Sequence, residues 1–249
     1  MHRLLVETRL LNEDAPLLPK DAARHLKVLR PRDGEEIELF DGKGKWRVYS
    51  CSSAQESASP LRAQSDIRTI ERPDNSLTLF ACVTKGSRWD WTVEKATELG
   101  VTRIVPVISE RTIVRIPWSE RAAKRERWLR IAEDAARQSD AKWLPEIREA
   151  VDFGDALPLV KETTCFIGAL TTPPARPLAG AIEDFRRETL DGKGVSVFIG
   201  PEGDFTPGEL EALMEIAVPT SFGPTILRAE TAAIFAVSVL ASHLNGKAD

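Results

Sequence analysis

The stretch "GVSVFIGPEGDFTPGEL", residues 194–210, carries the strongest fold signal in the chain. Its apolar start predicts a strand that ends at Gly200. Thr206 suits a helix N-cap, Pro207 suits the first helical position, and Glu209 completes a Thr-x-x-Glu capping box. The "GPEGDF" turn therefore joins the carboxyl end of a strand to a helix, and open α/β sheets bind their ligands at this edge.

The turn itself carries two carboxylates, Glu202 and Asp204. A helix N-terminus favours anions, but a triphosphate would be repelled by these side chains. The lysine and hydroxyl residue of a phosphate-binding loop are missing, and so is a GxGxxG pattern. Two interpretations remain open. The turn either binds a neutral or cationic ligand through backbone groups, or is a tight turn with solvated carboxylates.

Strands and helices alternate on both sides of this stretch. Apolar runs predict strands at residues 76–84, 101–108 and 163–170. A Ser87–Asp90 capping box and Gly100 bound one predicted helix, and a second runs from Ser119 to about Ser139. The helix after the turn is predicted to bury one apolar face, made of Leu210, Leu213, Met214 and Ala217. This alternation predicts a mostly parallel sheet with helices on both faces.

The chain before this region has a different pattern. Two β-prone runs flank Asp41-Gly42, which predicts a hairpin. Residues 20–30 predict a short helix with Leu26 and Leu29 turned inward. The polar cluster "ERPDNS", residues 71–76, marks the boundary. We therefore predict two domains, residues 1–72 and residues 73–249.

Composition limits the class of protein. With 249 residues, 42% apolar and 29% charged, the chain is typical of a globular protein with a real core. The net charge of −4 means that nucleic-acid binding would need local patches. The start lacks the apolar core of a signal peptide, and no apolar run has the ~18 residues of a membrane span. Cys51, Cys82 and Cys165 match no zinc or disulfide spacing, which favours a reduced cytoplasmic interior. The apolar runs around Cys82 and Cys165 predict that these two are buried rather than nucleophilic.

Two further segments are candidates for function. Residues 221–244 contain Arg228 and Glu230 at a helix entry, followed by a helix that is apolar nearly all round. That helix is either a core helix or an oligomer interface. Arg228 is either a partner for Glu230 or a group that steadies a phosphate or a developing charge. Residues 111–130 hold seven Arg or Lys against two Glu, which indicates either a solvated helix face or a phosphate-binding surface.

Taken together, these segments resemble the ribosomal RNA small-subunit methyltransferase E family, in the SPOUT class of knotted methyltransferases. The matching pieces follow the family's order almost from end to end. They are "RHLKVLRPRDGEEIELFDGKG", "KGSRWDWTVEKATELGV", "ISERTIVR", "RWLRIAEDAARQS", "IGPEGDFTPGEL" and "ILRAETAA". The resemblance implies an α/β fold with a SPOUT-type knotted parallel-sheet methyltransferase domain, preceded by a small PUA-like β-barrel domain that binds RNA. It also implies a trefoil knot in the C-terminal chain.

The resemblance implies an activity as well. It is methyl transfer from S-adenosylmethionine to N3 of a uridine in 16S ribosomal RNA of the small subunit, by a cytoplasmic homodimer without a metal or a membrane. The implied catalytic residues are Arg228 and Glu202. The implied cofactor-binding residues are Leu170, Thr171, Thr172, Ile199, Gly200, Pro201, Glu202, Gly203, Phe205, Gly223, Ile226, Leu227, Arg228, Glu230 and Thr231. The candidate RNA contacts are Arg9, His25, Lys27, Arg30, Lys85, Arg88, Arg111 and Arg115.

Three positions depart from the family pattern. Asp204 stands where the family has glycine, Asp140-Ala141 where it often has Gly-Arg, and Thr225 where it often has Arg. These departures bear on RNA affinity. They leave a second hypothesis, an RNA-binding or ribosome-assembly protein that keeps the fold without turnover. A nucleotide-dependent enzyme unrelated to RNA is disfavoured because phosphate-binding motifs are absent.

Overall fold

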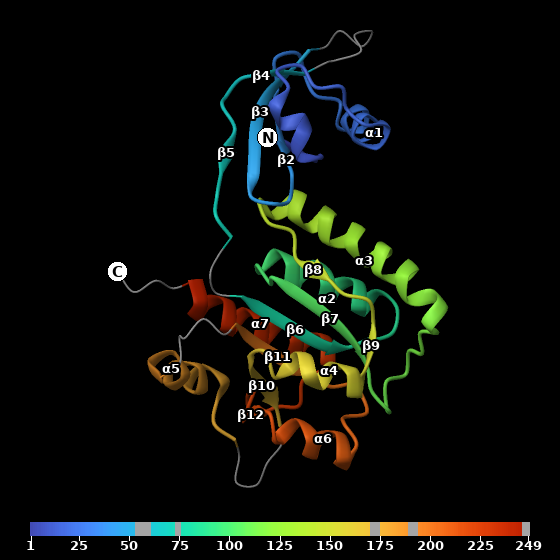
Figure 1. The fold of residues 1–249 in the computed structure, drawn as a ribbon, viewed down its shortest axis with the longest axis vertical. Coiled ribbons are helices and arrows are strands. Elements are labelled where there is room, and N and C mark those ends of the chain that lie inside the picture. The colour runs from blue at the N-terminus through green and yellow to red at the C-terminus, as the bar shows by residue number, and fades with distance from the viewer. Residues whose placement is uncertain (53–60, 73–75, 170–174, 189–193, 246–249) are drawn as a thin grey trace. The chain divides into compact units, whose positions relative to one another are not determined.

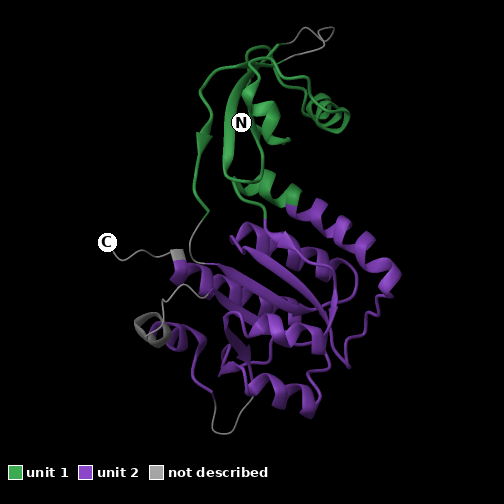
Figure 2. Cartoon of the chain, in the orientation of Figure 1, with its two compact units in different colours: residues 1–73, 133–144 green, residues 74–132, 145–249 purple. Residues whose placement is uncertain are grey.

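The computed structural model describes residues 1–52, 61–72, 76–169, 175–188 and 194–245. The chain divides into two compact units, shown in Figure 2. Unit 1 comprises residues 1–73 and 133–144, and unit 2 comprises residues 74–132 and 145–249. The sequence-based division did not assign residues 133–144 to the first domain. They join unit 1 because Lys142 and Leu144 form backbone hydrogen bonds of 2.9 Å with Gly44 and Gly42.

Unit 1 is built on a five-stranded sheet in the order β1-β2-β3-β4, with β5 also paired to β3. Its strands are β1 (His2–Leu5), β2 (Glu36–Phe40), β3 (Lys45–Cys51), β4 (Leu61–Ala63) and β5 (Arg68–Thr69). The predicted hairpin at Asp41-Gly42 is confirmed, because β2 and β3 are antiparallel neighbours. A 3₁₀ turn (Thr8–Asn12) and α1 (Lys20–Leu29) complete the unit. As predicted, α1 buries Leu26 and packs Leu29 against the core of unit 1.

Unit 2 contains a seven-stranded parallel sheet in the order β12-β10-β11-β6-β7-β8, with β9 paired to β7 (Figure 1). Its strands are β6 (Leu77–Cys82), β7 (Arg103–Ile108), β8 (Glu146–Ile147), β9 (Val151–Asp152), β10 (Thr164–Gly168), β11 (Val195–Ile199) and β12 (Ala217–Thr220). The prediction of a parallel sheet is confirmed. Its helices are α2 (Ser87–Glu98), α3 (Trp118–Ser139), α4 (Phe153–Val160), α5 (Leu178–Glu188), α6 (Pro207–Met214) and α7 (Ala229–Asn245); the last turns of α3 belong to unit 1.

Helices cover both faces of this sheet, as the alternation predicts. One core cluster contains residues of α2, α3, α5 and α7, and the other contains residues of α4 and α6. Successive residues of a strand enter opposite clusters, as Leu79 and Phe80 of β6 do, because strand side chains alternate between faces. Among the described residues, no helix is long and apolar enough to cross a membrane.

Two local predictions are wrong. Helix α2 has Gly86 as its N-cap with no side-chain cap hydrogen bond, so Ser87 is not a cap. Asp90 pairs with Arg127 of α3 instead. The helix after the "GPEGDF" turn, α6, ends at Met214, and the chain then enters β12. Ala217 is therefore buried in a strand, and Met214 is exposed.

Candidate functional site

Three neighbouring parallel strands end at one edge of the unit 2 sheet. β12, β10 and β11 end at Thr220, Gly168 and Ile199. The turns that follow them line a cavity of about 370 Å³, inside the ~300–1,000 Å³ typical of small-molecule pockets. Open α/β sheets bind ligands at this carboxyl edge, so the cavity is the candidate functional site.

The sequence located two of the three loops around this cavity. The predicted cofactor residues that line it are Ile199, Gly200, Pro201, Glu202, Gly223, Ile226, Leu227 and Arg228. Gly203, Phe205, Glu230 and Thr231 do not line it. Leu170, Thr171 and Thr172 lie outside the described residues. The cavity wall does include Gly168 and Ala169, which directly precede them.

Sequence reasoning missed several wall residues. They are Gly168, Ala169, Phe198, Asp204, Thr220, Ser221, Phe222, Thr225, Ala229 and Ala232. Thr220, Ser221 and Phe222 were missed because no strand was predicted at β12, whose first residue, Ala217, was assigned to the preceding helix. The pairing of β12 with β10 places them beside Gly168. A Cβ at Gly168 would lie 2.6 Å from the Phe222 ring, so glycine is needed there.

Phe205 faces the core rather than the cavity. Its residue is 6% exposed, and its ring centroid lies 5.5 Å from Phe198 and 5.9 Å from Phe153. A Cβ at Gly200 would lie 3.0 Å from the Phe205 ring. The aromatic cluster therefore anchors the turn from inside the protein. The Thr206–Glu209 capping box, which the structure confirms, fixes the turn at its other end.

The backbone conformation at residue 204 explains why Asp204 can stand where the family has glycine. Its φ of 58° lies in the left-handed region, where glycine is the default residue and Asp or Asn is the best-tolerated substitute. The Asp204 carboxylate also accepts a hydrogen bond of 2.8 Å from the Phe205 N–H. Asp140 likewise has a φ of 65° and pairs with Arg3 at 3.2 Å. Both aspartates therefore occupy backbone positions that suit glycine.

One arginine lies between two carboxylates at the cavity loops. The Arg88 guanidinium lies 3.6 Å from Glu202 Oε1 and 3.7 Å from Glu230 Oε1. Glu230, whose side chain is 12% exposed, pairs with Arg88 and not with Arg228. Arg228 has an exposed side chain without a partner among the described residues, at the cavity wall. Arg88, predicted as an RNA contact, thus links the turn at Glu202 to the first turn of α7.

Apolar side chains line much of the remaining cavity wall. Ile226 is 86% exposed, and Leu227 lies next to it. The backbone N–H groups of residues 226–228 form no hydrogen bond within the described parts of the chain. The cavity therefore offers an apolar surface, free backbone donors and carboxylates, which suits a flat heterocycle linked to a positively charged group.

The other predicted RNA contacts are exposed in both units. Arg9, His25, Lys27 and Arg30 belong to unit 1, where Arg9 pairs with Glu7 at 2.7 Å. Lys85, Arg111 and Arg115 belong to unit 2. Arg111 Nη1 donates to the carbonyl oxygens of Gly203 and Phe205, at 3.1 and 3.3 Å. Arg111 therefore braces the outer side of the cavity turn.

The cysteines are not nucleophiles. Cys51, Cys82 and Cys165 are all buried and free, which confirms the predicted burial of Cys82 and Cys165. Burial raises the pKa of Cys82 to about 11 and that of Cys165 to about 12, so both thiols stay protonated at neutral pH. Within the described residues, no cluster of His, Cys, Asp and Glu suits a metal ion.

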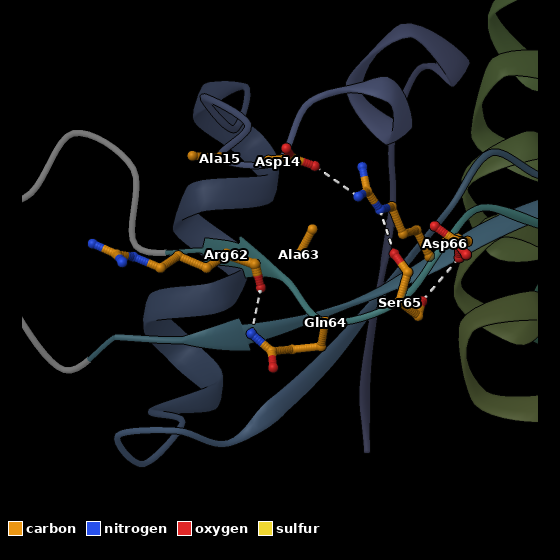
Figure 3. Close-up of a pocket in the computed structure, with 8 residues that line it drawn as sticks. Asp14, Ala15, Arg62, Ala63, Gln64, Ser65 and Asp66 are labelled. Atoms are coloured by element: carbon orange, nitrogen blue, oxygen red, sulfur yellow. Dashed lines mark hydrogen bonds and ion pairs between the residues drawn. The ribbon is translucent and has the colours of Figure 1, made fainter.

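Unit 1 has a larger but more open hollow, of about 700 Å³ (Figure 3). Its polar groups are largely engaged with one another. Arg47 contacts Asp14 Oδ1 and the Ser65 carbonyl, each at 2.7 Å. The Arg62 side chain points away from the other labelled residues. The smaller cavity in unit 2 remains the candidate site, because it lies at the carboxyl edge of a parallel sheet, where open α/β folds bind ligands.

Comparison with known proteins follows the same division. Residues 71–241 match the family model of an RNA methyltransferase domain, and residues 18–52 match that of an RNA methyltransferase PUA domain. The chain is 30% identical to the ribosomal RNA small subunit methyltransferase E of Synechocystis sp., over 95% of this chain and 76% of that one. It is 27% identical to the Bacillus subtilis protein of the same name, over 96% of both chains.

Solved structures are similar to the chain over nearly its whole length. The chain resembles a ribosomal RNA small subunit methyltransferase E from Neisseria gonorrhoeae bound to S-adenosyl methionine, with a TM-score of 0.77, 29% identity and 98% of each chain covered. It also resembles a putative methyltransferase from Legionella pneumophila in complex with the same cofactor, with a TM-score of 0.79 and 28% identity over 97% of this chain and 96% of that one.

Proposed function

This chain belongs to the ribosomal RNA small subunit methyltransferase E family, and we propose that it transfers a methyl group from S-adenosylmethionine to N3 of a uridine in 16S ribosomal RNA. The observation that carries the proposal is the cavity at the carboxyl edge of β10, β11 and β12. Its wall contains residues of two loops, 200–205 and 226–231, that the resemblance assigns to the cofactor.

The wall residues fit this cofactor chemically. Glu202 and Asp204 suit the positive charge of a sulfonium. Ile226 and Leu227 offer apolar contact for an adenine ring, and the free N–H groups of residues 226–228 offer hydrogen bonds to its edge. When bound, the cofactor supplies an electrophilic methyl group, and the protein mainly positions the reactants.

The reaction also includes a proton transfer. N3 of neutral uracil carries a hydrogen, so methylation requires that proton to leave. Arg228 is exposed at the cavity wall without a partner among the described residues, and its guanidinium would stabilise the anionic uracil ring or an adjacent phosphate. Glu202 is the candidate proton acceptor. Because Arg88 lies 3.6 Å from it, Arg88 orients that carboxylate.

Methyl incorporation into unmodified small ribosomal subunits tests the proposal, with mass spectrometry to locate the methylated uridine. Arg228→Ala should lower the rate about 100- to 1,000-fold, the usual effect of removing one charge-stabilising donor, while calorimetry shows nearly unchanged S-adenosylmethionine affinity. Lys161→Ala, which removes an exposed cation outside the cavity, should behave like the wild type. Full activity in Arg228→Ala would remove the proposed catalytic role. ATP binding without S-adenosylmethionine binding would refute the function.

The same experiment separates the second hypothesis, an assembly protein without turnover. Such a protein would bind the subunit and leave its mass unchanged. We favour turnover because Asp204 and Asp140 adopt backbone conformations that glycine also adopts, and because Asp140 is neutralised by Arg3 and Lys142. Asp204 therefore preserves the backbone of the cavity turn, and Asp140 preserves the backbone at the end of α3.

Three further properties complete the proposal. The apolar helix α7 would form the interface of a homodimer, the C-terminal chain would form a trefoil knot, and the protein would act in the cytoplasm. Phe235 supports the interface, because this large apolar residue of α7 is 39% exposed in the single chain. The exposed side chains of Arg9, His25, Lys27, Arg30, Lys85 and Arg115 would contact the RNA.

A further inference from the structure

The segment between β7 and α3 presents a large exposed aromatic side chain. Trp118 begins α3, and 78% of its surface is exposed. Ile113, in the same segment, is also exposed. Single exposed hydrophobic residues are common on protein surfaces, so exposure alone identifies no binding site.

Trp118 is held in place by a buried arginine. The Arg121 guanidinium lies 5.0 Å from the centroid of the Trp118 ring, a cation–π contact. Arg121 is in turn fixed, because its Nη2 donates to Asp152 Oδ1 at 2.7 Å and its side chain is 7% exposed. The Nε and Nη1 atoms of Arg121 have no hydrogen-bond partner in the described structure. One face of the indole is therefore anchored, and the rest of the ring is open to solvent.

The segment that carries Trp118 is attached to the cavity turn. Arg111 Nη1 donates to the carbonyl oxygens of Gly203 and Phe205. The Glu110 N–H donates to Glu209 Oε1 at 2.8 Å. The Glu209 side chain also caps α6, directly after the turn. Trp118 therefore follows directly on a segment that is hydrogen-bonded to the loops of the proposed methyl-transfer site.

The surroundings of Trp118 suit a polyanion. Residues 111–130 hold seven Arg or Lys and two Glu, and three of these cations, Arg121, Arg125 and Arg127, are paired with carboxylates. The Arg115 guanidinium donates hydrogen bonds to the backbone carbonyl oxygens of Ser109 and Glu110. Because these acceptors are neutral, they leave its positive charge uncompensated. Lys124 has no partner among the described residues. An exposed aromatic ring among uncompensated cations is the arrangement that binds single-stranded nucleic acid, with bases on the ring and phosphates on the cations.

We propose that the open face of Trp118 stacks on an unpaired base of the RNA substrate near the nucleotide that is methylated, with Arg115 and Lys124 at neighbouring phosphates. The inference rests on the proposed function, since it assigns the substrate of the same site a second contact. Arg121 and Asp152 act as positioning residues that hold the ring. An unpaired base is required, because bases inside a duplex have no free face for the indole.

Fluorescence anisotropy with two RNAs tests the inference on the full-length chain. The probes are a single-stranded oligonucleotide that contains uridine and the same strand annealed to its complement. Trp118→Ala should weaken binding of the single strand about 5- to 100-fold, the loss expected for one stacked base, with little change for the duplex. Trp118→Phe should retain most of the affinity. Trp91→Ala, which removes another partly exposed indole, is the matched control and should bind as the wild type does.

Several outcomes would overturn the inference. One is that Trp118→Ala binds the single strand with wild-type affinity. Another is that its affinity falls equally for the single strand and for the duplex. A shift of Trp118→Ala to another oligomeric state in light scattering would instead assign the surface to a second copy of the chain. If Trp118→Ala does not fold, Trp118→Leu keeps the apolar bulk without a ring and should lose the same affinity. S-adenosylmethionine affinity should stay unchanged in every variant. A wild type that methylates RNA while Trp118→Ala binds normally refutes the inference alone, whereas a wild type that neither binds nor methylates RNA refutes the proposed function with it.

Discussion

Substitution of Asp204 tests how the left-handed backbone of the cavity turn restricts its residue. A residue with a side chain at a φ of 58° destabilises the folded state by about 1–2 kcal/mol. This strain is smaller for Asp or Asn, and glycine adopts the same φ without it. Loss of the hydrogen bond from the Phe205 N–H costs about 0.5–1.5 kcal/mol more. We therefore expect Asp204→Ala to lower the free energy of unfolding by about 1–3 kcal/mol.

Two matched variants separate these contributions. Asp204→Asn keeps the acceptor and the tolerance for positive φ, so it should stay within about 0.5 kcal/mol of the wild type. Asp204→Gly loses the acceptor but removes the strain, so it should fall within about 1 kcal/mol. Urea unfolding, followed by the fluorescence of the buried Trp89 and Trp128 of the same unit, measures all three without cofactor. Equal stability of Asp204→Ala and Asp204→Gly would refute the reasoning.

Three more predictions follow from particular residues. Thr206→Ala removes the cap of α6 and should cost about 1 kcal/mol in urea unfolding; an unchanged midpoint would mean that the capping box contributes nothing. Burial raises the pKa of Cys82 to about 11 from the ordinary 9.0, so its contribution to stability is complete below pH 9 and is lost as the pH rises toward 11. Between pH 9 and pH 11, the free energy of unfolding of the wild type should therefore fall by about 3 kcal/mol more than that of Cys82→Ala. An equally steep fall in the two proteins would contradict the raised pKa. Phe235→Glu should convert the predicted dimer to a monomer in sedimentation equilibrium, and a wild type that is already monomeric would rule out the interface.

Local signals predicted the framework of the site well. The strand β11, the capping box at Thr206 and the start of α6 at Pro207 are all encoded within residues 194–210. The reason is that strand periodicity and helix capping depend on neighbours in the sequence. The same holds for the buried cysteines, which lie in apolar runs.

The features that the sequence did not predict depend on contacts between residues far apart in the chain. No local pattern distinguishes Phe205 as a core residue, because its direction depends on Phe153 and Phe198 in other elements. The strand β12 is too short to be identified by itself and becomes a strand through its pairing with β10. Asp90 was assigned to a cap from its spacing, but Arg127 of another helix binds it.

By itself, the sequence determined the alternation of strands and helices, the strand-to-helix turn at residues 200–206 and the composition of two cavity loops, because these depend on periodicity and capping within a few residues. The tertiary structure alone decided that Thr220–Phe222 close the cavity, that Arg88 pairs with Glu202 and Glu230, and that residues 133–144 join unit 1. Such pairings join residues far apart in the chain. Their partners are selected by sheet order and packing, which one segment does not specify.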